Sequence, residues 1–355
     1  MKILSVVGAR PQFVKLAAVC RAVQTASDVD HVIVHTGQHY DALMSDVFFE
    51  GLQIPQPDVN LGIGSRSHGA QTGAMLGALD PLLEQQRPDW TLVYGDTNST
   101  IAGALAAVKL HVPVAHLEAG LRSHNRRMAE EHNRVLTDHA ADLLLAPTER
   151  AMDNLAIEGL ARRAVLTGDV MVDICRAARD LVHATAPRLP RNIFPDDRYV
   201  LATIHRADNT DDGHRLRAIV EALQELSTPV VLVAHPRLLA RAAQLGVALD
   251  RGAVRIAAPL PYFEMVSAVM GAAGVVTDSG GLQKEAYLLG TPCTTVRTET
   301  EWVETLVDDW NVLDPSLECL SVLAARERPH SPQPAPFGDG RAAERVLDAL
   351  MTWSY

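Results

Sequence analysis

The chain has 355 residues, of which 47% are hydrophobic and 21% charged, and its formal net charge is −11. This length predicts two domains, and the composition is that of an ordinary globular protein with enough apolar material for buried cores. A nucleic-acid-binding protein usually carries a basic face, so the acidic balance argues against nucleic acid as a partner. An anionic small substrate stays compatible with net acidity, because phosphate is held by local groups.

The four cysteines lie far apart, at Cys20, Cys175, Cys293 and Cys319. None forms a C-x-x-C pair, so we expect neither a zinc site nor a disulfide framework, and we expect a reducing compartment. The first apolar run, Ile3–Val7, is too short for a signal peptide, and the sequence has no run of 18 apolar residues. These features predict a cytoplasmic protein that has no membrane segment.

The first half of the chain alternates short apolar runs with longer amphipathic segments. The runs typical of buried strands are Ile3–Val7, His31–His35, Thr91–Tyr94, Val112–His116 and Leu143–Ala146. The segments typical of helices are Phe13–Ala26, Ser67–Gln86, Thr100–Leu110 and Glu131–Ala140. Strands that alternate with helices predict an α/β fold, with a parallel sheet covered on both faces.

The same alternation starts again later in the chain, and we place the domain change near residues 168–190 because Thr185–Arg191 is rich in proline and arginine. The strand-like runs of this half are Ala164–Leu166, Tyr199–Thr203, Val230–Val233, Arg255–Ile256, Gly274–Thr277 and Cys293–Val296. Helices are predicted between them, notably at Asp211–Glu225 and Gly281–Leu289, and a last one at about Gly340–Thr352. Two doubly wound domains would leave a cleft between the carboxyl ends of their strands, where ligands bind.

One segment of the second half joins a strand to a glycine-rich helix start: Gly274-Val275-Val276-Thr277-Asp278-Ser279-Gly280-Gly281-Leu282-Gln283-Lys284-Glu285. Glycines let a backbone approach a ligand closely, and a helix start offers free N–H groups and a positive dipole end, which suit a diphosphate. Glu285 would lie one turn into the helix and could accept hydrogen bonds from ribose hydroxyls. The alternative is a plain strand–turn–helix junction that Ser279 caps.

Two polar segments follow strands of the first half. The first, Gly8–Lys15, opens a helix and brings two cations, Arg10 and Lys15, although Lys15 alone could equally be a surface charge. It is not a G-x-G-x-x-G fingerprint, so a dinucleotide cofactor is not indicated. In the second, Val93–Thr100, Asp96 is a candidate general base at the carboxyl end of the sheet. The alternative for Asp96 is a helix-capping aspartate.

Glu118 also follows a buried strand, where a carboxylate is costly unless it is paired or functional. Candidate partners are the arginines that come after it: Arg122, Arg126, Arg127 and Arg134. Glu130 and Glu131 open the next predicted helix, where the helix dipole alone favours acidic residues.

His205 stands beside Arg206 at the end of the first strand of the second domain. The pair suits an anion site or acid–base chemistry, and a structural histidine is the alternative. His235, before Pro236, ends another strand and could line the same cleft. The three strand-end carboxylate positions occur without an H-E-x-x-H, C-x-x-C or P-loop motif. The combination indicates proton transfer on an anionic substrate with neither a metal nor a nicotinamide cofactor.

Ten segments together resemble the non-hydrolysing UDP-N-acetylglucosamine 2-epimerase family, in the family's order and over almost the whole chain: GARPQFVKLAAV, HTGQHYD, VYGDTNST, HLEAGLRS, AEEHNR, TGDVMVD, HRADN, HPR, TDSGGLQKEA and FGDGRAAERVL. Each is weak alone, but their joint occurrence is specific. The resemblance implies a glycosyltransferase-B type fold of two Rossmann-like domains with a cleft. Residues 1–170 would hold the sugar and the catalytic carboxylates, and residues 171–339 would bind UDP. A final helix at 340–355 would pack back on the first domain, and the protein would be a homodimer.

The resemblance also implies a reaction that uses no cofactor. The proton at sugar C2 is not next to a carbonyl, so these enzymes eliminate UDP across C1–C2. They then protonate the opposite face of the 2-acetamidoglucal and add UDP back. Carried over by position, the catalytic residues would be Asp96, Glu118, Glu130 and His205. The UDP-sugar contacts would come from Arg10, Lys15, Arg134, Ser279, Gly280, Gly281 and Glu285.

Departures from the common family pattern indicate one branch. Ala129 stands where many members have a proline, and Thr300-Glu301-Trp302-Val303-Glu304 replaces Thr-Glu-Arg-Pro-Glu. GARPQF, HTGQHYD, NRRM and TEWVE are more similar to the branch that acts on UDP-2,3-diacetamido-2,3-dideoxy-glucuronate, whose carboxylate Arg126 or Arg127 could bind. The expected substrate is that sugar or UDP-N-acetylglucosamine, with the manno isomer as product. The alternatives are a glycosyltransferase of the same fold, which needs one base rather than a carboxylate set, and a UDP-sugar sensor.

Overall fold

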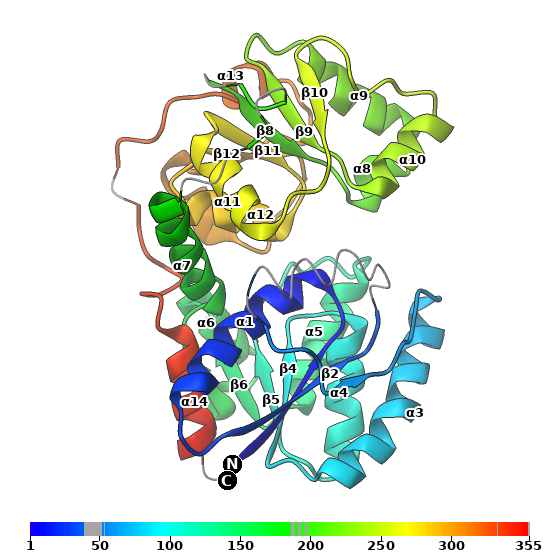
Figure 1. Ribbon diagram of the computed structural model, residues 1–355, viewed down its shortest axis with the longest axis vertical. Coiled ribbons are helices and arrows are strands. Elements are labelled where there is room, and N and C mark those ends of the chain that lie inside the picture. The colour runs from blue at the N-terminus through cyan, green and yellow to red at the C-terminus, as the bar shows by residue number, and fades with distance from the viewer. Residues whose placement is uncertain are drawn as a thin grey trace. The chain divides into compact units, whose positions relative to one another are not determined.

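The apolar runs of the sequence form parallel strands in two separate sheets (Figure 1). The computed structural model describes residues 1–38, 52, 54–185, 189–190, 193–195, 198–331 and 333–353, with only the backbone of Arg10. The chain divides into unit 1, Met1–Ile174 with Ala335–Tyr355, and unit 2, Cys175–Pro334. From the sequence we expect these two boundaries at 170/171 and 339/340.

Unit 1 contains a seven-stranded parallel sheet in the order β3-β2-β1-β4-β5-β6-β7. Its strands are β1 (Lys2–Val7), β2 (Asp30–His35), β3 (Val59–Asn60), β4 (Trp90–Tyr94), β5 (Val114–Leu117), β6 (Leu143–Ala146) and β7 (Ala164–Leu166). Every residue of β4, β5 and β6 is buried, which agrees with a sheet covered on both faces.

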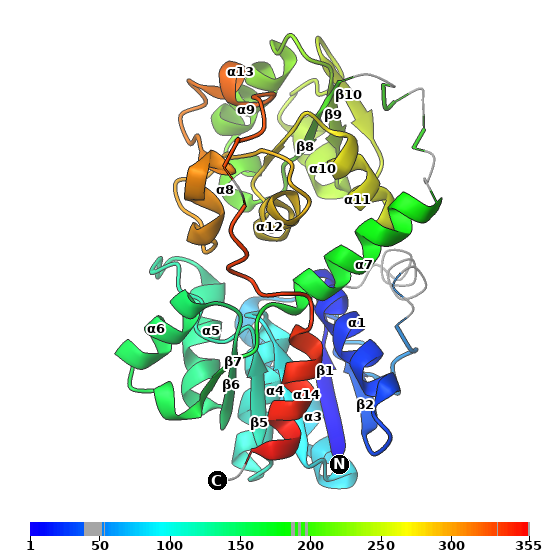
Figure 2. The ribbon, with the colours of Figure 1, turned by 90° about the vertical axis from the view of Figure 1, so that its left-hand side faces the viewer.

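The helices of unit 1 form two groups on opposite sides of its sheet (Figure 1). One group contains α1 (Arg10–Thr25) and α14 (Ala342–Thr352), which pack side by side (Figure 2). The other contains α3 (His68–Gln86), α4 (Asn98–Lys109) and α5 (Ala129–Ala140), and α6 (Glu149–Ile157) and a 3-10 turn, η1 (Ala161–Arg163), lead into β7. The Nε1–H of Trp90 donates to the carbonyl of Leu350 at 3.0 Å and ties the last helix to this sheet.

Unit 2 contains a six-stranded parallel sheet in the order β10-β9-β8-β11-β12-β13. Its strands are β8 (Val200–Thr203), β9 (Val230–Val233), β10 (Val254–Ala257), β11 (Gly274–Thr277), β12 (Cys293–Thr295) and β13 (Asn311–Leu313). Its helices are α8 (Ala207–Thr210), α9 (Gly213–Gln224), α10 (Pro236–Gln244), α11 (Tyr262–Gly271), α12 (Gly280–Leu288) and α13 (Leu320–Leu323), with a 3-10 segment η2 (Val303–Asp309). This arrangement gives a second doubly wound sheet.

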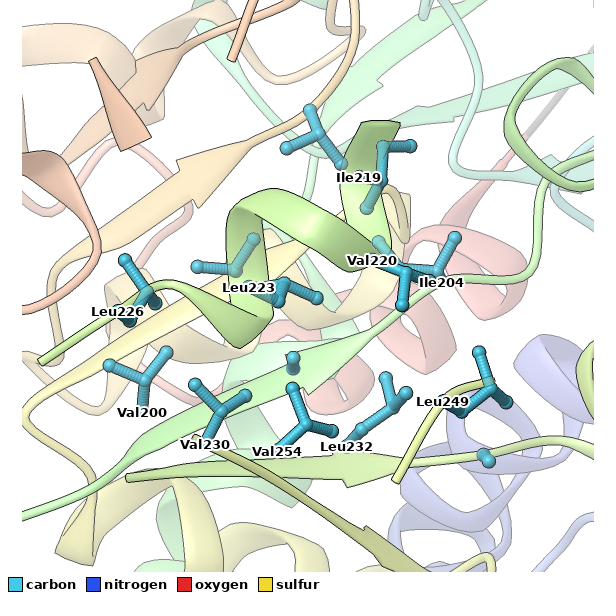
Figure 3. Close-up of a cluster of buried hydrophobic side chains, with 14 of the residues drawn as sticks. Val200, Ile204, Ile219, Val220, Leu223, Leu226, Val230, Leu232, Leu249 and Val254 are labelled. Atoms are coloured by element: carbon cyan, nitrogen blue, oxygen red, sulfur yellow. The ribbon is translucent and has the colours of Figure 1, made fainter. Parts of the chain in front are cut away.

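The core of unit 2 shows why its strands are apolar throughout. Alternate residues of a strand point to opposite faces, so Val230 and Leu232 enter one buried cluster while Val231 and Val233 enter another. Helix α9 contributes four apolar residues at helical spacing to the first cluster: Leu216, Ile219, Val220 and Leu223. Figure 3 labels the last three of them. Both faces of this sheet are therefore covered, as the sequence predicts.

The structure confirms the predicted strands to within about two residues and adds β3 and β13. The helix predicted from Asp211 begins later, at Gly213, because the carboxylate of Asp212 accepts from the backbone N–H groups at the start of α9. The helix α7 (Val170–Thr185) continues through the unit boundary, so the proline- and arginine-rich segment begins only where it ends. No helix in the described part of the chain is long and apolar enough to cross a membrane.

Candidate functional site

One side chain, that of Gln12, closes the turn between β1 and α1. Its Oε1 accepts hydrogen bonds from the N–H groups of Gly8 at 2.8 Å and Ala9 at 2.9 Å. Its Nε2 donates to the carbonyl of Tyr94 at 2.8 Å and the hydroxyl of Thr100 at 3.1 Å. Gln12 is 1% exposed. The N–H groups in front of this helix are therefore used inside the fold.

Lys15 of α1 and Glu118, which follows β5, form an ion pair, and each side chain is only 9% exposed. Lys15 is therefore not a surface charge. A Cβ on Gly95 would lie 3.1 Å from Glu118 Oε2 and from Lys15 Nζ, which places this pair against the turn after β4. The backbone of Arg10 begins α1, and its side chain lies outside the described part of the chain.

Within the described residues, Glu118 pairs with Lys15 and with none of the four arginines named as candidate partners. The guanidinium groups of two of these arginines have other partners. Arg122 pairs with Asp138 at 2.7 Å and with Glu158 at 2.7 Å. The guanidinium of Arg134 lies between Asp96 and Glu131.

Asp96 follows β4 and Gly95, and its carboxylate accepts a hydrogen bond from Arg134 of α5. Asp96 does not cap α4, because Thr97 is the capping residue and its hydroxyl accepts from the N–H of Thr100. The Asp96 side chain keeps 30% of its surface exposed, and its carbonyl accepts from Asn133 at 3.0 Å. The capping alternative is thereby excluded, and Asp96 is a partly exposed carboxylate held by a cation.

The two glutamates that open α5 have different surroundings. Glu131 is 5% exposed and accepts hydrogen bonds from the Ser123 N–H and hydroxyl, the His124 N–H and Arg134. Burial would raise the pKa of Glu131, but the bonds from Ser123 and the charge of Arg134 outweigh it and lower the pKa. Glu130 is exposed, and no ion pair of Glu130 occurs within the residues that the structure describes. Glu131 therefore fixes the loop before α5, whereas the carboxylate of Glu130 stays accessible to a ligand.

In unit 2, His205 rests on a buried carboxylate. Its Nδ1 lies 3.1 Å from Asp278 Oδ1, and 47% of its side chain is exposed. Asp278 is fully buried and also accepts from the N–H groups of His205 and Arg206 and from Asn209. Burial would raise the pKa of Asp278, but hydrogen bonds from His205 and Asn209 lower it overall. An ionised Asp278 accepts from Nδ1–H, which leaves Nε2 at the exposed end of the ring.

The start of α12 keeps free backbone donors. Ser279 is its capping residue, and the Ser279 hydroxyl accepts from the Leu282 N–H at 3.3 Å. The N–H groups of Gly280 and Gly281 have no hydrogen-bond partner among the described residues. Glu285, half-buried, lies about one turn further along α12. The capping role and the open N–H groups coexist, so this helix start can accept an anion.

Glu301 places two arginines near this helix start. Its carboxylate lies 3.0 Å from the Nη1 of Arg297 and 3.5 Å from the Nη2 of Arg206. A Cβ at Gly280 would overlap the Oε1 of Glu301. Gly280 must therefore be glycine for this carboxylate to reach its place.

The predicted residues fall into two groups, one in each unit. In unit 1, ion pairs join Lys15 to Glu118 and Asp96 to Arg134, and Glu130 precedes Arg134 by one turn of α5. In unit 2, α12 carries most of the other group, and Asp278, directly before its capping residue, holds His205. Among the residues that the structure describes, no cluster of His, Cys, Asp or Glu could hold a metal ion.

The structure also shows supporting residues to which the sequence assigns no role: Gln12, His116, Glu131, Asp138, Asp278, Arg297 and Glu301. Two of them carry a signal in hindsight. His116 is a polar residue within an apolar strand. Asp278 directly follows a strand, where a buried carboxylate needs several hydrogen-bond donors. Some partners of the others come from distant segments, such as Tyr94 and Thr100 for Gln12, and no local pattern reveals these.

A sequence profile of the UDP-N-acetylglucosamine 2-epimerase family matches residues 21–351. The chain belongs to this family. The UDP-2,3-diacetamido-2,3-dideoxy-D-glucuronate 2-epimerase of Pseudomonas aeruginosa is 46% identical over 99% of both chains. The crystal structure of Methanocaldococcus jannaschii UDP-GlcNAc 2-epimerase in complex with UDP-GlcNAc and UDP is 37% identical, with a TM-score of 0.90 over 99% of this chain and 100% of that one.

As a member of the UDP-N-acetylglucosamine 2-epimerase family, the chain is an isomerase with the predicted α/β architecture. A lipopolysaccharide outer core galactosyltransferase, WaaB, matches 99% of both chains with a TM-score of 0.54 and 11% identity. That likeness concerns the fold alone, and it confirms the predicted glycosyltransferase-B type. The family match favours the epimerase over the glycosyltransferase alternative.

Proposed function

We propose that this member of the epimerase family inverts C2 of a UDP-sugar through elimination and re-addition of UDP. The carboxylate set of unit 1 is the main support. Asp96 and Glu118 follow the adjacent strands β4 and β5, and Glu130 lies on the helix whose Arg134 pairs with Asp96. A transferase needs one base for its acceptor, whereas epimerisation needs a base and an acid on opposite faces of C2.

In the proposed reaction, the C2–H and C1–O bonds break and a C1=C2 double bond forms. One carboxylate takes the C2 proton, and UDP leaves with the electron pair of the C1–O bond. A second side chain, in its carboxylic acid form, then gives a proton to the opposite face of C2, the C1=C2 π electrons form the new C2–H bond, and UDP re-forms the C1–O bond. Ion pairs with Lys15 and Arg134 hold Glu118 and Asp96 in one geometry, which lowers the entropic barrier to proton transfer.

Unit 2 is proposed to bind the UDP. The open N–H groups of Gly280 and Gly281, at the positive end of α12, suit the diphosphate, and Ser279 and Arg10 would add contacts. Glu285 would accept from the ribose, and the exposed end of His205 would stabilise the departing diphosphate. The M. jannaschii relative, whose crystal structure contains UDP-GlcNAc and UDP, supports UDP as the ligand.

We further propose that the sugar is the 2,3-diacetamido uronate, which is the substrate in the name of the 46% identical relative from P. aeruginosa. Its carboxylate needs a cation that is not already neutralised. Arg122 and Arg134 each pair with two carboxylates. Arg126 and Arg127 lie exposed in the loop before α5, and neither forms an ion pair within the described residues. This loop therefore offers the positive charge that a uronate needs.

The choice between the two sugars is tested with Arg126→Met and Arg127→Met. If the uronate is the substrate, at least one variant lowers kcat/KM for it about tenfold or more, the effect of one charge-assisted contact. The value for UDP-N-acetylglucosamine should change less than threefold, as should both values in the exposed control Arg150→Met. Equal losses for both sugars would contradict the assignment.

The reaction itself is tested in heavy water. We expect proton NMR to show loss of the C2 signal in recovered substrate and product, because the proton removed from C2 exchanges with solvent. Retention of that proton, with the sugar moved to an added acceptor, would instead identify a glycosyltransferase.

A further inference from the structure

His116 lies in a buried chain of charges beneath the carboxylates of unit 1. The residue is fully buried, with its Nδ1 2.6 Å from Asp138 Oδ1 and its Nε2 2.6 Å from the carbonyl oxygen of Gly95. Beyond Asp138 the chain continues to Arg122 at 2.7 Å and then to Glu158 at 2.7 Å. Only Glu158, whose side chain is 26% exposed, reaches solvent.

Both ring nitrogens of His116 face acceptors, so both must donate. A carbonyl oxygen has no hydrogen to give, and Asp138 is ionised. Burial would raise the pKa of Asp138, but the charges and hydrogen bonds of His116 and Arg122 lower it overall. With both nitrogens protonated, the two cations His116 and Arg122 balance the carboxylates of Asp138 and Glu158, as a buried cluster requires. His116 then has no lone pair with which to accept a proton from a substrate.

The Nε2–H of His116 fixes the turn that presents Asp96. Its acceptor is the carbonyl of Gly95, the residue directly before Asp96. Gly95 has a φ of 62°, and its N–H donates to the carbonyl of Leu117 at 2.9 Å. The turn is thus tied to β5 from both its N–H and its carbonyl.

Asp138 fixes the turn that presents Glu118. Its Oδ2 accepts from the N–H of Gly120, two residues after Glu118, at 3.1 Å. Glu118 has a φ of 72°, a left-handed conformation that is unfavourable for glutamate by about 1 kcal/mol and that persists only where its surroundings impose it. The carbonyl of Leu145 accepts from the N–H of Glu118 at 3.1 Å and supplies the other constraint.

We propose that His116 and Asp138 are positioning residues that set the placement of Asp96 and Glu118 for proton transfer at C2. Asp138 lies on α5, which carries Glu130 in its first turn, so one buried pair joins all three carboxylate-bearing segments. This role presupposes the epimerase function proposed above. It assigns no contact with the substrate to either residue.

The variants His116→Gln and Asp138→Asn test this role. The single amide nitrogen of glutamine cannot reach both acceptors of His116, and asparagine keeps the shape of Asp138 without its charge. We expect kcat to fall about 10- to 100-fold in both, the effect of small misplacements of reacting groups. KM and UDP affinity should change less than twofold, because most groups assigned to UDP lie in unit 2 and neither His116 nor Asp138 is one of them.

The matched control is Glu158→Gln, which breaks the outer end of the same charge chain. We expect it to lower Tm while kcat stays within twofold of the parent value. If His116→Gln and Asp138→Asn lower Tm but keep parental kcat, the pair is only structural and the proposal is wrong. If the parent protein shows no C2 exchange with either sugar, the epimerase function fails first.

Nitrogen-15 NMR of His116 in the parent protein gives a readout that is independent of turnover. We expect both ring nitrogens to carry hydrogen, since both face acceptors. A bare ring nitrogen would overturn the two-donor arrangement. A normal spectrum beside unchanged kcat in both variants would reject the positioning role and leave the proposed reaction intact.

Discussion

The two strand–turn–helix junctions that look most alike in the sequence are built differently. Before α1, the side chain of Gln12 occupies the N–H groups of Gly8 and Ala9. Before α12, Ser279 caps one N–H, and the N–H groups of Gly280 and Gly281 stay open among the described residues. The first, which we call the closed junction, is structural support for the carboxylates of unit 1. The second, which we call the open junction, suits an anion.

The difference follows from the reach of one side chain. Glutamine at position 12 is long enough to return from the first turn of α1 to the strand end, where it also bonds Tyr94. The short side chain of Ser279 reaches only the N–H of Leu282. A glycine after a strand therefore indicates an anion site only when no nearby side chain satisfies the turn.

The largest expected effect is the loss of kcat when a carboxylate of unit 1 is changed. Asp96→Asn keeps the shape of the side chain but removes a charge that we assign to proton transfer. We expect kcat to fall about 1,000-fold, within the range for a general acid or base. Turnover measured by proton NMR decides this, with the exposed Asp80→Asn as control. A loss smaller than tenfold would remove Asp96 from the proposed chemistry.

Gln12→Leu tests the closed junction itself. The change leaves two backbone N–H groups and two oxygen acceptors without their partner in a buried site. We expect the free energy of unfolding to drop by about 2–4 kcal/mol, measured in urea. UDP affinity should stay within twofold, whereas exposed Gln85→Leu should change neither quantity. A weaker UDP complex with normal stability would place the anion site at this junction instead.

Gly280→Ala tests the open junction. The added methyl group overlaps Glu301 and displaces the carboxylate that holds Arg206 and Arg297. We expect KM for the UDP-sugar to rise about tenfold, which corresponds to about 1.4 kcal/mol. The matched control is Gly77→Ala in α3, where a Cβ meets nothing within 4 Å. Equal KM values in the two variants would show that the start of α12 is not a binding site.

The smallest expected effect is on the pH dependence of stability, and it follows from carboxyl groups whose surroundings shift their pKa in opposite directions. Hydrogen bonds lower the pKa of Asp278 in unit 2, whereas burial raises the pKa of Asp173 in unit 1 to about 6. Asp173 accepts from the N–H groups of Ala342 and Ala343 and so caps α14. Its folded-state pKa exceeds the unfolded value of about 4, so the native state binds more protons between about pH 4 and pH 6.

It follows that the Asp173 contribution to stability is greatest below about pH 4 and declines as the pH rises to about 6. Relative to Asp173→Asn, which does not titrate, the parent protein should lose about 1–2 kcal/mol of unfolding free energy between pH 4 and pH 7, allowing for the partial exposure of the carboxyl group. Urea titrations at several pH values measure the difference. A parent protein that becomes more stable relative to Asp173→Asn as the pH rises would contradict the raised pKa.

Sequence patterns predicted the strands well because central parallel strands are buried on both faces, and Val230–Val233 needs no partner to look like one. They did not predict β13, whose three residues acquire strand geometry only by pairing with β12. Candidate site residues such as Asp96 followed from their place at strand ends. The partner of Glu118 could not be predicted, because Lys15 is 103 residues away and only the fold brings them together.

Titration calorimetry of UDP against Asp96→Asn and Gly280→Ala tests most directly whether the open junction of unit 2 binds the nucleotide while unit 1 carries the chemistry. We predict that Asp96→Asn binds UDP within twofold of the parent protein and that Gly280→Ala binds it about tenfold more weakly. The reverse order, with UDP binding lost in Asp96→Asn and kept in Gly280→Ala, would contradict this division between the two units.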